Sequence, residues 1–142
     1  MSSTIERVKY DGKGRLKKHS VQKYADSQDG KPAGVYEVSA ENSGVKVSYQ
    51  GQDESFQGYI SENEEIYTHH DENGEYTISV CNENINLDTP NKISAGDFKE
   101  KLLADRQKME GIIKDVTGYS SVEEYHEQKF PIIHQKLAEN TR

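Results

Sequence analysis

Apolar and polar residues alternate through the middle of the chain. Five short runs show this period of two and begin ten or eleven residues apart, at 35–38, 45–49, 56–60, 66–69 and 76–80. Alternation of this kind places successive side chains on opposite faces of a strand. Clusters of Gly, Asn, Asp and Ser separate the runs, and Asn73-Gly74 suits a tight turn. The pattern predicts an antiparallel meander.

The period of two also assigns a face to each side chain of these strands. One face is apolar and should meet the core; it collects Val45, Val47, Tyr49, Phe56, Gly58, Ile60, Ile66, Thr68, Tyr76, Ile78 and Val80. The other face is mostly polar and should meet water or a partner; it collects Lys46, Ser48, Gln57, Tyr59, Tyr67, His69, Thr77, Ser79 and Cys81. A sheet with one solvated face is ordinary for antiparallel strands.

The C-terminal third changes to helical spacing. Ser94 and Asp97 predict the start of a first helix, and Gly118 predicts its end. Ser121 opens a second helix with a capping box, and Tyr125, Phe130, Ile133 and Leu137 give that helix an apolar side. Pro131 must kink or split it near Phe130, because proline lacks an amide proton.

The predicted fold is therefore α+β, a single domain over 1–142. An antiparallel β-meander of five or six strands carries a C-terminal helical hairpin packed on one face. The meander spans 35–88, the hairpin spans 94–140, and 1–34 is a basic N-terminal arm. For that arm two outcomes stay open: a flexible segment, or a first strand near Ile5 to Tyr10 with a short helix over 16–24.

Composition restricts the class of protein further. A chain of 142 residues with one cysteine, Cys81, has the length of one domain and no intrachain disulfide. Apolar runs stay far below the roughly 18 residues of a transmembrane helix. The N-terminal residues lack the apolar stretch of a secretory signal, so we expect a cytoplasmic location.

The formal net charge of −7 is concentrated in one block. Residues 47–91 carry ten Asp and Glu and no Lys or Arg, a net charge of −10. Residues 1–46 carry nine basic and six acidic side chains, and residues 92–142 carry nine of each. Like charges held together repel one another, and a cationic partner relieves that repulsion. A solvated face that keeps the protein soluble is the simpler explanation of such a block.

The acidic block is the predicted binding site. Turns carry most of its carboxylates, and tyrosine supplies contact area at low entropic cost. The expected partner-binding residues are Asp53, Glu54, Tyr59, Glu62, Glu64, Glu65, Tyr67, His69, Asp71, Glu72 and Glu75. They predict a non-catalytic protein-binding or inhibitory protein, such as an antagonist, immunity-type inhibitor or adaptor, that binds a basic protein surface.

Two alternatives stay open. One is a small metal-dependent enzyme that uses His69, His70 and Asp71, although neighbouring residues of a strand point to opposite faces. Glu123 and His126 show a second metal-ligand spacing, but only one copy is present. The other alternative is a protein that sequesters a small anionic ligand, with the basic N-terminal arm closing over it. We expect no catalytic residues, no cofactor, no membrane association and no direct nucleic-acid binding, the last because of the negative net charge.

Overall fold

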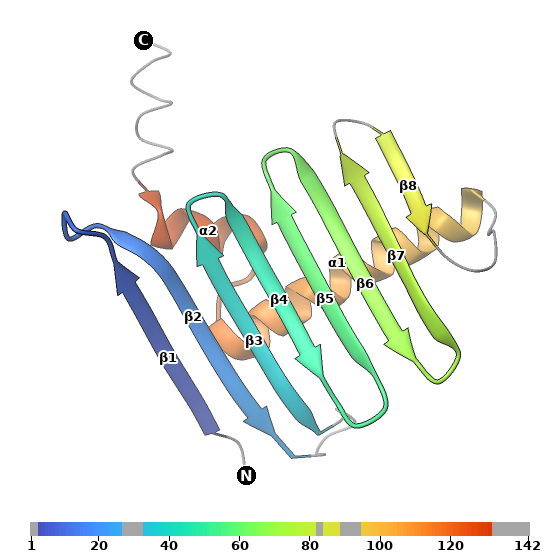
Figure 1. Cartoon of the computed structure of the whole chain (residues 1–142), viewed down its shortest axis with the longest axis horizontal. Coiled ribbons are helices and arrows are strands. Elements are labelled where there is room, and N and C mark those ends of the chain that lie inside the picture. The colour runs from blue at the N-terminus through green and yellow to red at the C-terminus, as the bar shows by residue number, and fades with distance from the viewer. Residues whose placement is uncertain (1–2, 27–32, 82–83, 89–94, 132–142) are drawn as a thin grey trace.

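One antiparallel sheet with two helices on one side forms the structure (Figure 1). The computed structural model describes residues 3–26, 33–81, 84–88 and 95–131. Eight strands lie side by side in chain order: β1 (Ser3–Tyr10), β2 (Leu16–Ala25), β3 (Gly34–Glu41), β4 (Gly44–Gln50), β5 (Ser55–Ser61), β6 (Glu64–Asp71), β7 (Gly74–Cys81) and β8 (Asn84–Asp88). The predicted α+β meander is confirmed, with eight strands in place of five or six.

The described part of the basic N-terminal arm contributes two strands, β1 and β2, to this sheet. The short helix predicted over 16–24 is wrong, because these residues form β2, which pairs with β1 on one side and with β3 on the other. His19 and Val21 are both buried on the helix-covered face, opposite Ala40 and Val38. Alternate burial of this kind is possible in a strand but not in a helix. The lysines of this segment obscured the period of two.

The two helices begin and end where the sequence indicated. Helix α1 (Ala95–Thr117) is followed by Gly118, which has φ +85° and donates its N–H to Lys114 O at 3.0 Å. Helix α2 (Val122–Lys129) is capped by Ser121, whose Oγ accepts the N–H of Glu124 at 3.1 Å. Helix α2 ends before Pro131, as expected. Ser94, Ile133 and Leu137 lie outside the described residues.

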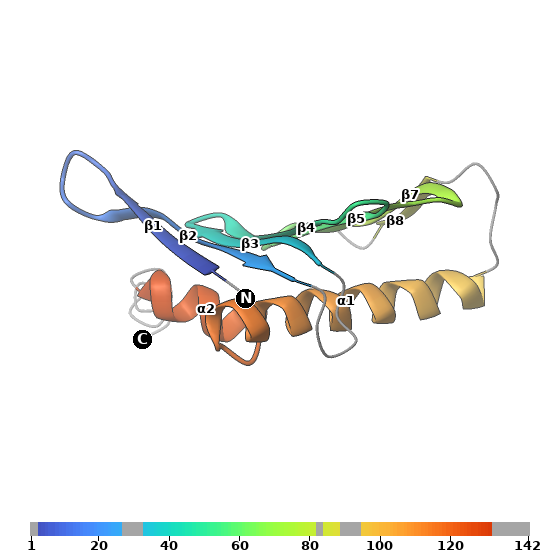
Figure 2. The ribbon, with the colours of Figure 1, turned by 90° about the horizontal axis from the view of Figure 1, so that it is seen from below.

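Both helices cover the same face of the sheet and leave the other face uncovered (Figure 2). The core lies under α1, where the fully buried Met109 and Ile113 belong to one hydrophobic cluster with the fully buried Val38, Val47 and Ile78 of the sheet. Gly58 lies in the same cross-strand row as these residues. A Cβ at Gly58 would lie 2.9 Å from Met109 Sδ, so the absence of a side chain there lets α1 approach the sheet.

Beside this core runs a row of rings across five neighbouring strands. The pairing places Tyr36, Tyr49, Phe56, His69 and Tyr76 next to one another on the helix-covered face. The rings of Tyr36 and Tyr49 meet edge to face at 4.8 Å, and His69 stacks on Tyr76 at 4.8 Å. We name these five residues the aromatic row.

The face assignment of β6 is reversed relative to the prediction. Ile66 and Thr68, expected in the core, lie opposite Tyr59 and Gln57 on the uncovered face. The two-residue turn Glu62-Asn63 fixes this register, because it places Glu65 opposite Ile60. Tyr67 and His69 therefore face the helices. The other predicted members of the apolar face are confirmed by the same pairing.

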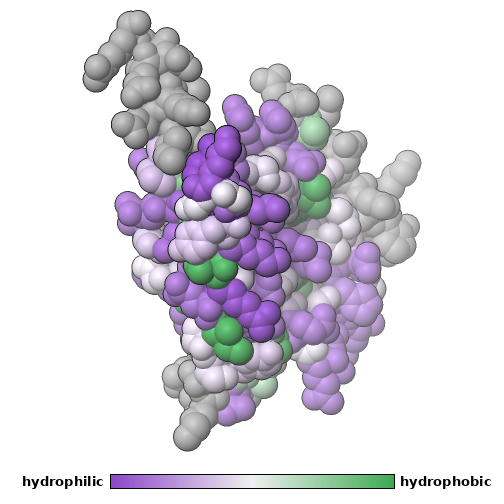
Figure 3. Space-filling view, turned by 60° about the vertical axis from the view of Figure 1, so that its left-hand side comes forward, coloured by the Kyte–Doolittle hydropathy of each residue, from purple (hydrophilic) through white to green (hydrophobic). Residues whose placement is uncertain are grey.

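Strand β1 forms an outer edge of the sheet, and every residue in it is exposed. Figure 3 turns this edge towards the viewer; hydrophilic side chains dominate it, and the hydrophobic patches are small and separate. Ile5 and Val8 are the exposed aliphatic residues of β1, at 40% and 46%. Charged residues between them, such as Glu6 and Arg7, disfavour pairing of this edge with another strand.

Candidate functional site

The structure divides the predicted acidic site between the two ends of the sheet. One end of the sheet carries a concave surface that encloses a volume of about 460 Å³. Four acidic residues at or beside the turns line it: Asp53, Glu54, Asp71 and Glu72. Glu62, Glu64 and Glu65 belong to the β5–β6 hairpin at the other end. The seven residues of β5 separate the two ends by about 20 Å. The block that is continuous in sequence is therefore two surfaces in space.

The aromatic and imidazole members of the predicted site also separate. Tyr59 lies on the uncovered face opposite Lys46 and Ile66. Tyr67 is fully buried, and only 21% of the His69 side chain is exposed, because the reversed face of β6 turns both towards α1. The prediction that these two residues are exposed is wrong. Glu75 is exposed near the start of β7, where the strand register places it opposite His70 of β6.

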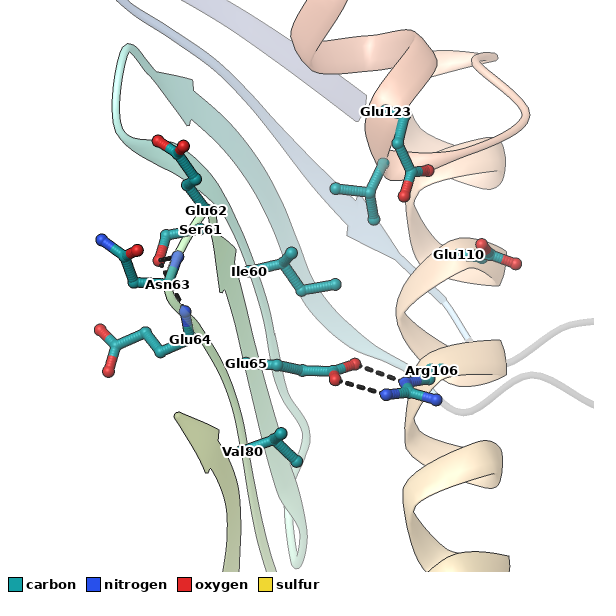
Figure 4. A pocket seen from close by; sticks show the side chains of 11 residues that line it. Ile60, Ser61, Glu62, Asn63, Glu64, Glu65, Val80, Arg106, Glu110 and Glu123 are labelled. Carbon is teal, nitrogen blue, oxygen red and sulfur yellow. Dashed lines mark hydrogen bonds and ion pairs between the residues drawn. The ribbon is translucent and has the colours of Figure 1, made fainter. Parts of the chain in front are cut away.

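The larger cleft lies between the β5–β6 hairpin and the two helices (Figure 4). It has a volume of about 540 Å³. Ile60 and Val80 project from the sheet, and Val122 of α2 also lines the cleft, so the floor is apolar. Glu110 on α1 and Glu123 on α2 form the helical rim, while Glu62 and Glu64 lie at the outer side of the hairpin. We name this site the acidic cleft.

One ion pair crosses the acidic cleft. Arg106 on α1 donates from Nε and one terminal nitrogen to the two oxygens of Glu65, at 2.6 and 2.7 Å. The Tyr67 hydroxyl donates to the same carboxylate at 2.6 Å. Burial alone would raise the pKa of Glu65, but the hydrogen bonds from Arg106 and Tyr67 outweigh it and hold the pKa below its usual value. Glu65 is therefore an anion whose carboxylate already accepts hydrogen bonds from Arg106 and Tyr67.

The carboxylates of Glu110 and Glu123 add negative charge at the helical rim, whereas those of Glu62 and Glu64 point away from the helices (Figure 4). Five glutamates line it: Glu62, Glu64, Glu65, Glu110 and Glu123. Among the described residues of the lining, Arg106 is the only cation, and Glu65 already engages it in a two-pronged ion pair. An apolar floor with an acidic rim matches the lysine or arginine side chain, which has an apolar stem and a charged head.

The other candidate ligand groups are not brought together. His69 Nε2 lies 2.5 Å from Asp105 Oδ1 under α1, whereas His70 is exposed on the opposite face. His126, three residues after Glu123, reaches the carbonyl oxygens of Glu41 and Asn42 at 2.9 and 3.2 Å. Within the part of the chain that the structure describes, no three metal-ligating side chains converge.

The basic N-terminal arm lies apart from these two surfaces. Its described lysines and arginines lie along β1, β2 and their connecting turn, at the outer edge of the sheet. In the turn, Asp11 accepts hydrogen bonds from the backbone N–H groups of Lys13 and Arg15 at 2.8 and 3.0 Å. Of the lysines and arginines in the part of residues 1–34 that the structure describes, none lines the cleft of 540 Å³ or the concave surface of 460 Å³.

Helix α2, which carries Val122 and Glu123, is attached to the sheet through Tyr125. Its side chain is fully buried, and its hydroxyl lies 2.7 Å from His19 Nδ1 on β2. His19 is itself buried, and its Nε2 lies 3.5 Å from Glu6 Oε1. Burial, and next the charge of Lys129, lower the pKa of His19 below its usual 6.5. The neutral imidazole is therefore the form that holds α2 in place.

The free energy of unfolding should fall as the pH drops from about 7.5 to about 5.5. His19 binds a proton less readily in the folded chain, so acid favours the unfolded chain once the pH passes below the usual value of 6.5. Urea unfolding at several pH values measures the slope. His19→Gln should flatten it, whereas His70→Gln, which changes an exposed imidazole, should leave it unchanged. Equal slopes for wild type and His19→Gln would contradict the assignment.

Comparisons with protein family models, with curated proteins and with solved structures found no match for this chain. In the described part of the chain, neither helix combines the length and apolarity that crossing a membrane requires. The geometry of the acidic cleft is therefore the basis for a functional conclusion.

Proposed function

We propose that this protein is a non-catalytic binding protein, of the inhibitor or adaptor type, whose acidic cleft takes a basic segment of a partner protein. One observation carries the proposal: five glutamates line a cleft of about 540 Å³ in which the single arginine is already paired. A cation from outside would relieve the mutual repulsion of these carboxylates. It would also cover the apolar surface of Ile60, Val80 and Val122.

The proposal narrows the surface expected from sequence. Of the eleven predicted partner-binding residues, it retains Glu62, Glu64 and Glu65, and it adds Glu110 and Glu123 from the helices. Tyr67 contributes indirectly, because its hydroxyl holds Glu65 in place. Tyr59, on the uncovered face, and the carboxylates at the opposite end of the sheet have no part in this cleft.

Neutralising the helical rim should weaken the complex. We expect Glu110→Gln combined with Glu123→Gln to reduce affinity for a basic partner about ten-fold, since each is an exposed carboxylate at the cleft near the expected cation. The affinity of the wild type should also fall as salt rises from about 50 to about 500 mM, and this salt dependence should be smaller in the double variant. Fluorescence anisotropy with labelled lysine- and arginine-containing peptides measures both effects.

A matched control lies on the same helix. Glu100 is exposed on α1 and does not line the cleft, so Glu100→Gln removes one carboxylate away from the site and is compared with each single variant, Glu110→Gln and Glu123→Gln, as well as with the double variant. If Glu100→Gln weakened binding as much as the double variant, the effect would come from total charge and the proposed site would be wrong. The proposal would also be refuted if the affinity were the same at low and high salt and the same in the wild type and the double variant.

A further inference from the structure

A second cleft lies on the other side of α1, where the helix crosses the aromatic row. Its volume is about 330 Å³, which suits one side-chain-sized group. The lining is partly aromatic and partly charged, and consists of Tyr36, Tyr49, Glu54, Lys108, Gly111, Ile112 and Asp115. It shares Tyr49 and Glu54 with the concave surface at that end of the sheet, and it shares no lining residue with the acidic cleft. We name it the tyrosine cleft.

Two tyrosine rings form the floor of the tyrosine cleft. Tyr36 and Tyr49 pack edge to face, with ring centres 4.8 Å apart, and only 8% and 4% of their surfaces are exposed. Burial chiefly, with a contribution from the carboxylate of Glu54, raises the pKa of both hydroxyl groups. The hydroxyl groups therefore stay neutral, and the faces of the rings keep the electron-rich character that attracts a cation.

The protein already places a cation of its own against this surface. Lys108 Nζ lies 5.1 Å from the centre of the Phe56 ring and 6.0 Å from the centre of the Tyr49 ring. These distances are within the range of a cation–π interaction. Lys108 is exposed, so its flexible side chain can move aside for a ligand. Tyr49 therefore already accepts an ammonium group, and the same ring lines the tyrosine cleft.

Gly111 opens the cleft from the helix side. It lies inside the 23-residue helix α1, where glycine lowers helix stability relative to alanine. A Cβ built at Gly111 meets nothing within 4 Å, so close packing does not require glycine there. Any larger side chain at this position would extend from the rim of the tyrosine cleft. Glycine at this position leaves the helix side of the rim without a side chain.

Taken together, these features point to a cation. We propose that the tyrosine cleft binds an alkylammonium group such as the head of a lysine side chain, with the rings of Tyr36 and Tyr49 beneath it and Glu54 beside it. Asp115 at the rim pairs with Lys23 at 3.1 Å, so Glu54 is the carboxylate that we expect to meet the ligand. The site is independent of the acidic cleft and does not rest on its proposed function.

Nitrogen-15 NMR titration of the full chain with N-acetyl-lysine methylamide tests the site. The amide signals of Gly111, Ile112 and Glu54 should shift and saturate. N-acetyl-norleucine methylamide, which has the apolar stem without the charge, should bind about three-fold more weakly or not at all, because the cation–π attraction is lost. Equal shifts with the uncharged ligand would overturn the proposal, and so would tighter binding of N-acetyl-glutamate methylamide.

Three variants move the affinity in different directions. Lys108→Gln removes the internal competitor and should tighten lysine binding about three-fold; Gly111→Leu should abolish it by filling the space; Glu54→Gln should weaken it. Gly111→Leu puts a better helix former at an open position, so its melting temperature should not fall, which separates loss of binding from loss of fold. Weaker lysine binding by Lys108→Gln, or unchanged binding by Gly111→Leu, would refute the assignment.

Discussion

Replacing His69 with leucine should lower the free energy of unfolding by about 3–5 kcal/mol. Asp105 is buried on α1, with 3% of its side chain exposed, and its Oδ1 lies 2.5 Å from His69 Nε2. Without the imidazole, the buried Asp105 side chain would lose the partner that its Oδ1 contacts. Burial and the Asp105 charge both raise the pKa of the Tyr76 hydroxyl and keep it neutral, so Tyr76 can offset the loss only in part, as a neutral hydrogen-bond donor. Urea unfolding followed by circular dichroism measures the loss.

The neighbouring histidine provides the control for this result. His70 lies on the uncovered face and is exposed, so His70→Leu should change stability by less than about 0.5 kcal/mol. A double variant, His69→Leu with Asp105→Leu, should recover most of the loss, because it removes the stranded charge as well. If His70→Leu proved the more damaging change, β6 would present its faces as the alternation of Ile66 and Thr68 first indicated.

Replacing Tyr125 with alanine should cost about 3–5 kcal/mol, the usual loss for removing a buried aromatic side chain. Tyr125 is fully buried between α2 and β2, and its hydroxyl lies 2.7 Å from His19 Nδ1. The loss should be concentrated in α2, a helix of only eight residues that depends on its packing against the sheet. Hydrogen exchange should show faster exchange of the α2 amides with little change in β4–β7.

The same substitution should also reduce binding by the acidic cleft, because α2 carries Val122 and Glu123. Tyr125→Phe is the matched control: it keeps the ring and loses only the hydroxyl group, so about 1 kcal/mol should be lost and binding should persist. If Tyr125→Ala made the amides of the whole sheet exchange as much faster as those of α2, the packing of α2 would not be separable from the stability of the sheet, and this account would be wrong.

Local patterns in the sequence were sufficient for most of the fold. The strands β3 to β7 follow from alternation, and Gly118, Ser121 and Pro131 mark the helix boundaries through the capping and proline geometry of the residues themselves. Strand β2 was missed because Lys17, Lys18 and Lys23 interrupt the apolar pattern, although His19 and Val21 are buried.

The error in β6 has a specific physical origin. Ile66 and Thr68 look more apolar than Tyr67 and His69, so hydrophobicity alone favours the wrong face. Tyr67 is accommodated in the core because its hydroxyl donates to Glu65 at 2.6 Å, and His69 because of Asp105. Turn length would have corrected the assignment: the two-residue turn Glu62-Asn63 sets the register from β5 directly.

The candidate site depended on contacts that a linear pattern does not contain. Successive turns of a meander lie at alternate ends of the sheet, so an acidic block 45 residues long divides into two surfaces. Glu110 and Glu123 join one of them only because the helices fold back over the sheet. Sequence predicted the sign of the partner's charge, whereas the helices determine which of the two surfaces forms a cleft with an apolar floor.

Zero-length carbodiimide cross-linking of a bound basic partner tests the central proposal most directly, because it joins a carboxylate to an amine in direct contact. Mass spectrometry of the cross-linked peptides should place the partner's lysines on Glu110 and Glu123 at the rim of the acidic cleft, with Glu62 and Glu64 as further positions. Cross-links confined to Asp53, Glu54, Asp71 and Glu72 at the opposite end of the sheet would contradict it.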